Sequence, residues 1–81
     1  MSSLDQTVST QNKRIDMLKD HGITEREKDI IGCMIEGLNN NEISEKLFIS
    51  KNTVKRHIQN IYEKLNIENK IKLFNILKIK N

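Results

Sequence analysis

The feature that most constrains this chain is one amphipathic segment, residues 50–65. It begins at Ser50, whose hydroxyl can cap a helix by accepting a free backbone N–H of the first turn. At about 100° per residue, the apolar residues then fall on one side of that helix: Val54, Ile58, Ile61 and Leu65, with Tyr62 at the edge. The other side carries Asn52, Lys55, Arg56, Gln59 and Glu63. The segment therefore predicts a helix over residues 51–65 with a core face and a polar face.

The polar face of this helix has two interpretations. Lys and Arg side chains suit guanine edges, and Gln and Asn side chains suit adenine edges, so the face could read base pairs. It could also be a solvated surface, as most polar helix faces are. Residues 24–47 carry six acids and three bases, whereas residues 50–65 and 66–81 each carry a net charge of +3. This distribution favours a polyanion as partner, although a lysine-rich tail can also serve solubility alone.

Two shorter helices are predicted upstream of this segment. Thr24 and Glu27 have the spacing of a capping box, in which each side chain bonds the backbone N–H of the other residue. A second box, Asn39 and Glu42, opens the next helix. A turn at residues 48–49 then leads directly to Ser50. Two helices joined so tightly, the second with a basic outer face, predict a helix-turn-helix.

The helical phase predicts which side chains of these two helices are buried. Gly32 falls on the exposed side of the first helix, and Cys33 lies at the edge of its apolar stripe. A small buried residue is the expected role of Cys33, rather than a reactive thiol. In the second helix, Ile43, Leu47 and Phe48 should face inward.

The last helix is predicted over about residues 70–79, after Asn66 closes the long helix in a left-handed conformation and Asn69 caps the new one. Its apolar residues spread around most of the circumference: Ile71, Leu73, Phe74, Ile76, Leu77 and Ile79. A helix that is apolar on several sides needs two packing partners. We therefore expect a homodimer contact through Leu73, Phe74, Ile76 and Leu77, the alternative being that all six residues are internal core.

The chain divides into two parts. Residues 1–22 are polar and are expected to form a flexible N-terminal segment or linker, in which residues 11–20 could form a short helix ended by Gly22. Residues 23–81 should form the ordered domain. The longest apolar run, residues 30–35, is too short to span a bilayer, and no signal-peptide pattern is present. With one cysteine and no membrane partner expected, the cytoplasm is the predicted location.

Taken together, these stretches resemble the LuxR-type (GerE-type) helix-turn-helix domain of bacterial transcription regulators. They are Ile23-Thr24-Glu25-Arg26-Glu27, Glu36-Gly37-Leu38-Asn39-Asn40-Asn41-Glu42-Ile43, Leu47-Phe48-Ile49-Ser50, Thr53-Val54-Lys55-Arg56-His57 and Ile61-Tyr62-Glu63-Lys64-Leu65. The resemblance covers about residues 23–79. It implies an all-α domain of four helices, a three-helix core plus a C-terminal dimerisation helix. It also implies a recognition helix in the major groove and binding to inverted half-sites.

The resemblance also implies roles for individual side chains. Lys55, Arg56 and Gln59 match base-reading positions, and Asn52 shares their face of the helix. The expected phosphate-binding set is Lys51, Thr53, Asn40, Asn41 and Lys64. His57 matches a histidine of the family and borders the core, so its expected role is packing and positioning. Asn41 stands where the family often has Lys, which removes a phosphate-binding charge.

We therefore expect sequence-specific binding of double-stranded DNA by a dimeric transcription regulator, with RNA polymerase as a further candidate partner. Two alternatives remain: a sigma-factor region-four-like module acting with RNA polymerase, and a helix-turn-helix used only for protein interaction. Catalysis is not expected, because His21 and His57 are far apart in sequence and Cys33 is alone. Neither a glycine-rich phosphate loop nor metal-ligand spacing is present, so no cofactor and no metal are expected.

Overall fold

The computed structural model describes residues 15 and 17–78, and over these residues it contains helices and no strand. A 3₁₀ helix, η1, spans Met17–His21. Four α-helices follow: α2 (Glu25–Ile35), α3 (Asn40–Leu47), α4 (Lys51–Leu65) and α5 (Lys70–Leu77). The predicted all-α class and the four-helix helix-turn-helix domain are confirmed.

The helix ends follow the capping chemistry of the sequence. At α2 the Glu27 N–H donates to Thr24 Oγ1 at 3.2 Å, and the Thr24 N–H donates to Glu27 Oε1 at 2.9 Å. At α3 the Asn39 and Glu42 side chains make the same reciprocal pair at 2.8 and 2.9 Å. Asn66 ends α4 with φ 55°, in the left-handed region that Asn tolerates. Both predicted capping boxes are thus present, and they set where α2 and α3 begin.

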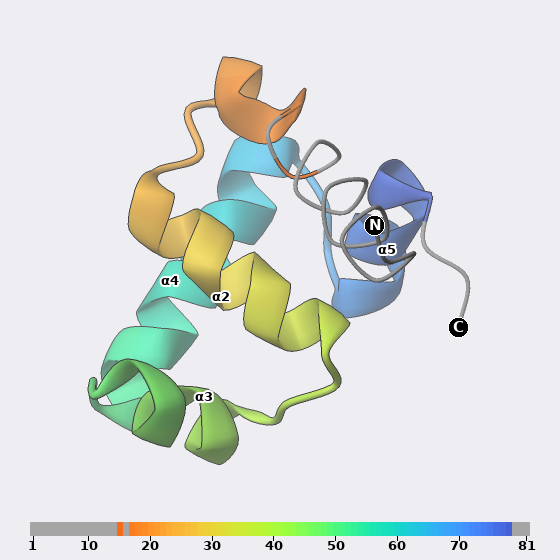
Figure 1. Ribbon diagram of the computed structural model, residues 1–81. Helices are drawn as coiled ribbons and strands as arrows, with labels where there is room; N and C mark the ends of the chain where they lie inside the picture. Colours follow the sequence, from red (N-terminus) through yellow and green to blue (C-terminus); the bar gives the residue numbers. More distant parts are fainter. Residues whose placement is uncertain (1–14, 16, 79–81) are drawn as a thin grey trace, which may run out of the picture.

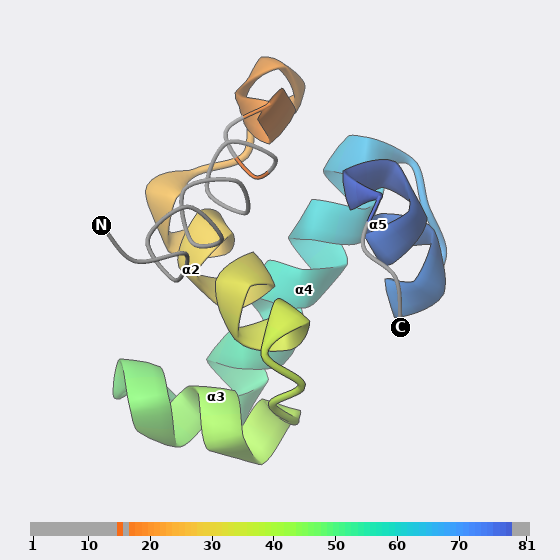
Figure 2. The same ribbon diagram turned by 45° about the vertical axis from the view of Figure 1, so that its right-hand side comes forward.

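The core lies where α2, α3 and α4 meet. In Figure 1, α2 crosses α4, while α3 lies across the N-terminal end of α4. Figure 2 shows α5 beside the C-terminal half of α4, away from α3. The largest fully buried side chains come from all four helices: Ile30, Ile31, Ile43, Val54, Ile61 and Leu73. Because α4 is held from several sides, its remaining face is the one left to solvent.

One prediction about burial is wrong, and the core extends further towards the N-terminus than expected. Phe48 does not face inward: it ends α3 with φ 59° and its side chain is 92% exposed. The folded unit also begins before Ile23, because Ile15 and Leu18 belong to the hydrophobic core. Within the segment 1–22 that we predicted to be flexible, residues 1–14 and 16 lie outside the described residues. Gly22, with φ 80°, ends η1 in the left-handed conformation expected of it.

The apolar residues of α5 divide between the core and the surface. Leu73, Phe74 and Leu77, which we predicted at a dimer contact, are buried within the domain itself. Of the four predicted contact residues only Ile76 is exposed, at 44%, and Ile71 is exposed at 62%. Three apolar residues of this helix are therefore buried without a second copy of the chain. Ile79 lies outside the described residues.

Candidate nucleic-acid interface

Ser50 is the N-cap residue of α4 and fixes its first turn. Its hydroxyl accepts the Thr53 N–H at 3.0 Å and lies 2.8 Å from the Thr53 hydroxyl. An α-helix leaves the other N–H groups of its first turn without partners inside the helix, and the positive end of the helix dipole lies there. Lys51 is exposed at this end. The turn thus offers backbone donors and a cation to an anion, which is the chemistry that binds phosphate.

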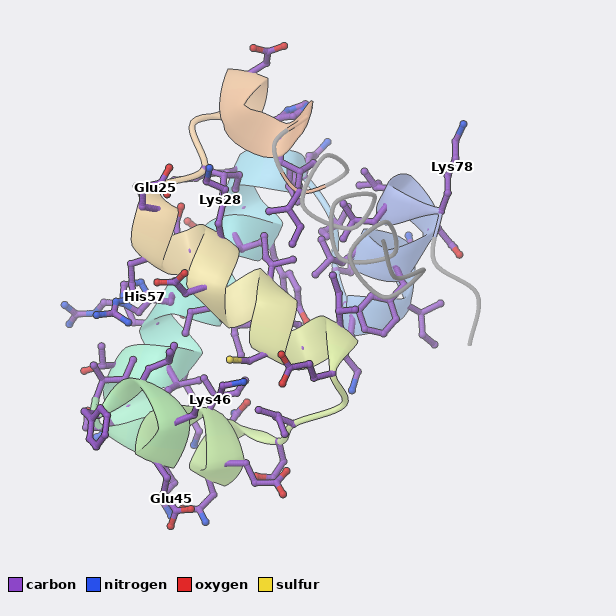
Figure 3. The ribbon with its side chains drawn as sticks, viewed as in Figure 1. Glu25, Lys28, Glu45, Lys46, His57 and Lys78 are labelled. Atoms are coloured by element: carbon purple, nitrogen blue, oxygen red, sulfur yellow. The ribbon has the colours of Figure 1, made fainter. Side chains whose placement is uncertain are left out.

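The predicted base-reading side chains share the exposed face of α4. They are Asn52, Lys55, Arg56 and Gln59, all of them exposed. On the opposite face Val54 and Ile61 are fully buried, and this packing fixes the rotation of the helix about its axis. The structure therefore brings the four residues together on one surface. His57 is half-buried beside this face, at the border of the core where the helical phase placed it (Figure 3).

One contact on this face concerns how Gln59 would present its amide. Gln59 Nε2 lies 3.5 Å from Glu63 Oε2, one turn further along α4. Turning the amide over would place its oxygen against the carboxylate, so Glu63 favours one orientation of donor and acceptor. Sequence reasoning placed Glu63 on the polar face but assigned it no role. The spacing of four residues between a Gln and a Glu was the signal that could have identified this pair.

The predicted phosphate-binding residues do not form one cluster. Lys51 and Thr53 lie in the first turn of α4, and the Thr53 hydroxyl is already paired with that of Ser50. Asn40 and Asn41 lie in the first turn of α3, at the opposite end of that helix from the turn into α4 (Figure 1). Asn41 is exposed and Asn40 half-buried. They would have to contact the backbone at a separate point from Lys51.

Lys64 is engaged within the protein. Its ammonium donates to Glu27 Oε1 at 2.7 Å and to the Gly22 carbonyl at 2.9 Å. Glu27 is only 3% exposed, and burial alone would raise the pKa of its carboxyl. The hydrogen bonds from Lys64 and Thr24, with the charge of the ammonium, outweigh burial, so the pKa of Glu27 is lowered. A phosphate contact by Lys64 would have to compete with this buried carboxylate.

A groove of about 490 Å³ lies between α2 and α3. The charged side chains at its rim are paired, Lys28 with Glu25 at 2.8 Å and Lys46 with Glu36 at 2.9 Å (Figure 3). Cys33 also lines the groove, and burial raises the pKa of its thiol, which stays protonated at neutral pH. Over residues 15 and 17–78, no cluster of side chains could hold a metal ion. No helix in this part of the chain is long and apolar enough to cross a membrane.

Together α3, the turn after it and α4 define a helix-turn-helix whose second helix carries an exposed, basic, hydrogen-bonding face. Residues 21–77 match the family described as bacterial regulatory proteins, luxR family. This match covers most of the chain, which therefore belongs to the LuxR family of bacterial regulatory proteins. No solved structure matches the chain.

Curated relatives of the chain are named as transcriptional regulators. The chain is 46% identical over 48 residues to a probable csgAB operon transcriptional regulatory protein of Salmonella typhimurium, covering 59% of this chain and 22% of that protein. It is 40% identical over 50 residues to the transcriptional regulatory protein DegU of Brevibacillus brevis, covering 62% of this chain and 21% of that protein. It is 34% identical over 55 residues to the HTH-type transcriptional regulator MalT of Vibrio campbellii, covering 68% of this chain and 6% of that protein. The matched region is thus a small part of each relative. The family and these names support DNA binding in the regulation of transcription.

Proposed function

We propose that this domain binds specific sequences in double-stranded DNA by inserting α4 into the major groove. The observation that carries the proposal is the exposed face of α4, where Lys55, Arg56 and Gln59 lie opposite the buried Val54 and Ile61. Arg and Lys match guanine and Gln matches adenine in that groove. DNA as ligand would place the protein in the cytoplasm.

The first turn of α4 would position the helix on the DNA. In this proposal Lys51 and the free backbone N–H groups beside it bind phosphate, while Asn40 and Asn41 bind the backbone at the start of α3. Phosphate contacts fix register and orientation, whereas base contacts carry sequence information. Replacing a phosphate-binding residue and replacing a base-reading residue should therefore have different effects on DNA binding.

The test begins with selection of a binding site from random duplexes by the wild-type protein, followed by salt titrations of variants on the selected and a scrambled duplex. Arg56→Ala or Gln59→Ala should cost about 1–3 kcal/mol on the selected duplex and much less on the scrambled one. Lys51→Ala should weaken both and lower the salt slope by about one unit. Lys70→Ala, which removes an exposed charge on α5, serves as the control and should leave both affinities unchanged. Equal losses on both duplexes for the Arg56 and Gln59 variants would show that the face is merely electrostatic.

We further propose that the domain binds inverted half-sites as a dimer, through α5. Ile76 and Ile71 are exposed on that helix, and the buried Phe74 and Leu77 hold it against the domain. Burial of two exposed isoleucines supports only a weak contact in free solution. Binding of two copies to adjacent half-sites would strengthen the contact, because the DNA holds the two copies at high local concentration.

A further inference from the structure

A short segment before α2 packs onto the rest of the domain. We call Ile15, η1 and Gly22 the strap. The side chains of Ile15 and Leu18 are buried in the hydrophobic core. A 3₁₀ helix of five residues is too short to persist without such packing, and Gly22, with φ 80°, turns the chain at its end. The strap therefore holds its place through tertiary contacts, and such a segment can leave a fold while the longer helices stay formed.

One ammonium group ties the strap to the last turn of α4. Lys64 Nζ donates to the Gly22 carbonyl at 2.9 Å and to Glu27 Oε1 at 2.7 Å. Leu18 of the strap also belongs to the same hydrophobic core as Leu65, the last residue of α4. The strap, the start of α2 and the end of α4 are thus joined at Lys64.

This junction lies at the end of α4 that the proposed interface does not use. Lys51 and Lys64 are about 20 Å apart along the helix, at about 1.5 Å per residue. Figures 1 and 2 both show η1 near the C-terminal end of α4 and α3 at the opposite end. Because a helix transmits a change of packing along its length as a rigid element, contacts at Lys64 help to orient the face that carries Arg56 and Gln59.

We propose that docking of the strap and binding of DNA are coupled through Lys64, so that each strengthens the other. The inference rests on the proposed function, since it needs DNA bound by α4. With the strap docked, α4 is held in the orientation that fits the major groove. With the strap released, the end of α4 loses the Gly22 acceptor and the cover of Leu18, so the helix can tilt.

The coupling acts in both directions. DNA binds the docked state better than the released state, and by linkage it favours docking by the same factor. An event that displaces the strap therefore lowers DNA affinity from the far end of α4, without touching the interface. The strap is in this sense a regulatory device of the domain.

The first experiment displaces the strap and measures DNA affinity. Leu18→Asp places a charge among apolar side chains, whereas His21→Asp adds the same charge at an exposed position of the strap. Affinity for the duplex that the wild-type protein selects should fall about tenfold for Leu18→Asp and stay within about twofold for His21→Asp. Circular dichroism should show that both variants keep their helices. Unchanged affinity of Leu18→Asp overturns the proposal, and so does its complete unfolding, because the strap would then be inseparable from the core.

The second experiment measures hydrogen exchange of the amides of residues 17–22, with and without a saturating amount of the selected duplex. Exchange should slow about tenfold on DNA in the wild-type protein and in Lys46→Met, which breaks an ion pair away from the strap. In Lys64→Met the DNA should change the exchange by less than about twofold. If DNA slows exchange equally in Lys64→Met, or leaves it unchanged in the wild-type protein, the coupling is wrong.

The two levels of the argument fail separately in these experiments. A wild-type protein that selects no sequence refutes the proposed function, and the coupling with it. A selected site that is bound regardless of the strap refutes the coupling alone.

Discussion

Substitution of Lys64 by methionine keeps the length of the side chain and removes the ammonium that pairs with Glu27. The buried carboxylate then keeps its hydrogen bond from the Thr24 N–H, at 2.9 Å, and loses the charged donor at 2.7 Å. The Gly22 carbonyl loses its donor at 2.9 Å as well. Because this pair joins the start of α2 to the end of α4, the change should weaken the packing of α4, which carries the interface, against α2.

The cost can be bounded from the burial of the two partners. Removing one member of a fully buried ion pair typically costs about 3–5 kcal/mol, because an uncompensated charge remains. Here the Lys64 side chain is 32% exposed, so water can reach the pair and part of that cost is screened. We expect Lys64→Met to lower the free energy of unfolding by roughly 2 kcal/mol at pH 7. This is a large share of the ~5–15 kcal/mol that stabilises a typical domain.

The pH dependence of this loss has a definite sign. In the wild-type protein the pKa of Glu27 is lowered, so its contribution to stability is present above the unfolded-state pKa and is lost as pH falls through the folded-state pKa. In the variant the hydrogen bond and the charge of Lys64 no longer lower the pKa of Glu27, which should therefore rise. The stability that ionised Glu27 contributes at neutral pH is then reduced. The difference between the two proteins should therefore be largest at neutral pH and shrink towards pH 4.

Urea unfolding followed by circular dichroism at pH 7 and pH 4 measures this difference. A loss of roughly 2 kcal/mol lowers the urea midpoint by about 1–2 M for a domain of this size. Lys46→Met is the matched control, since it breaks the exposed pair with Glu36 and should lower the urea midpoint far less than Lys64→Met at either pH. A loss at pH 7 no larger than that of the control, or one that does not shrink at pH 4, would refute the reasoning.

Three further predictions follow from single positions. Gly32→Ala should raise the free energy of unfolding by about 0.5–1 kcal/mol in urea titrations, because an added Cβ meets nothing within 4 Å; a destabilised variant would show that the site is crowded. Leu73→Asp should unfold the monomer, because Leu73 is fully buried, whereas Ile76→Asp should stay folded by circular dichroism and weaken only the pairing of two copies on DNA, as seen by sedimentation. Glu63→Ala should relax base preference at the position that Gln59 reads, as repeated site selection would reveal; an unchanged preference would mean that Glu63 does not orient the amide.

Much of the fold could be predicted because it depends on contacts between residues close in sequence. A capping box needs only two side chains three residues apart, so Thr24 with Glu27 and Asn39 with Glu42 located two helix starts. The left-handed Asn66 ended α4 for a similarly local reason. The face of α4 that is exposed also followed from its phase alone, since the apolar side of a helix must find cover. These features made the family resemblance readable from the chain.

The contact between Lys64 and Glu27 was beyond such reasoning, because the two residues are 37 positions apart and only the crossing of α2 and α4 brings them together. Phe48 was misplaced because helical phase assumes that the helix continues, whereas at this residue the chain leaves α3 in a left-handed conformation and turns the ring outward. The burial of Ile15 and of Leu73 was likewise settled only when the elements packed. Periodicity identifies which side of a helix is apolar, but the area available on its neighbours decides how much of that side is covered.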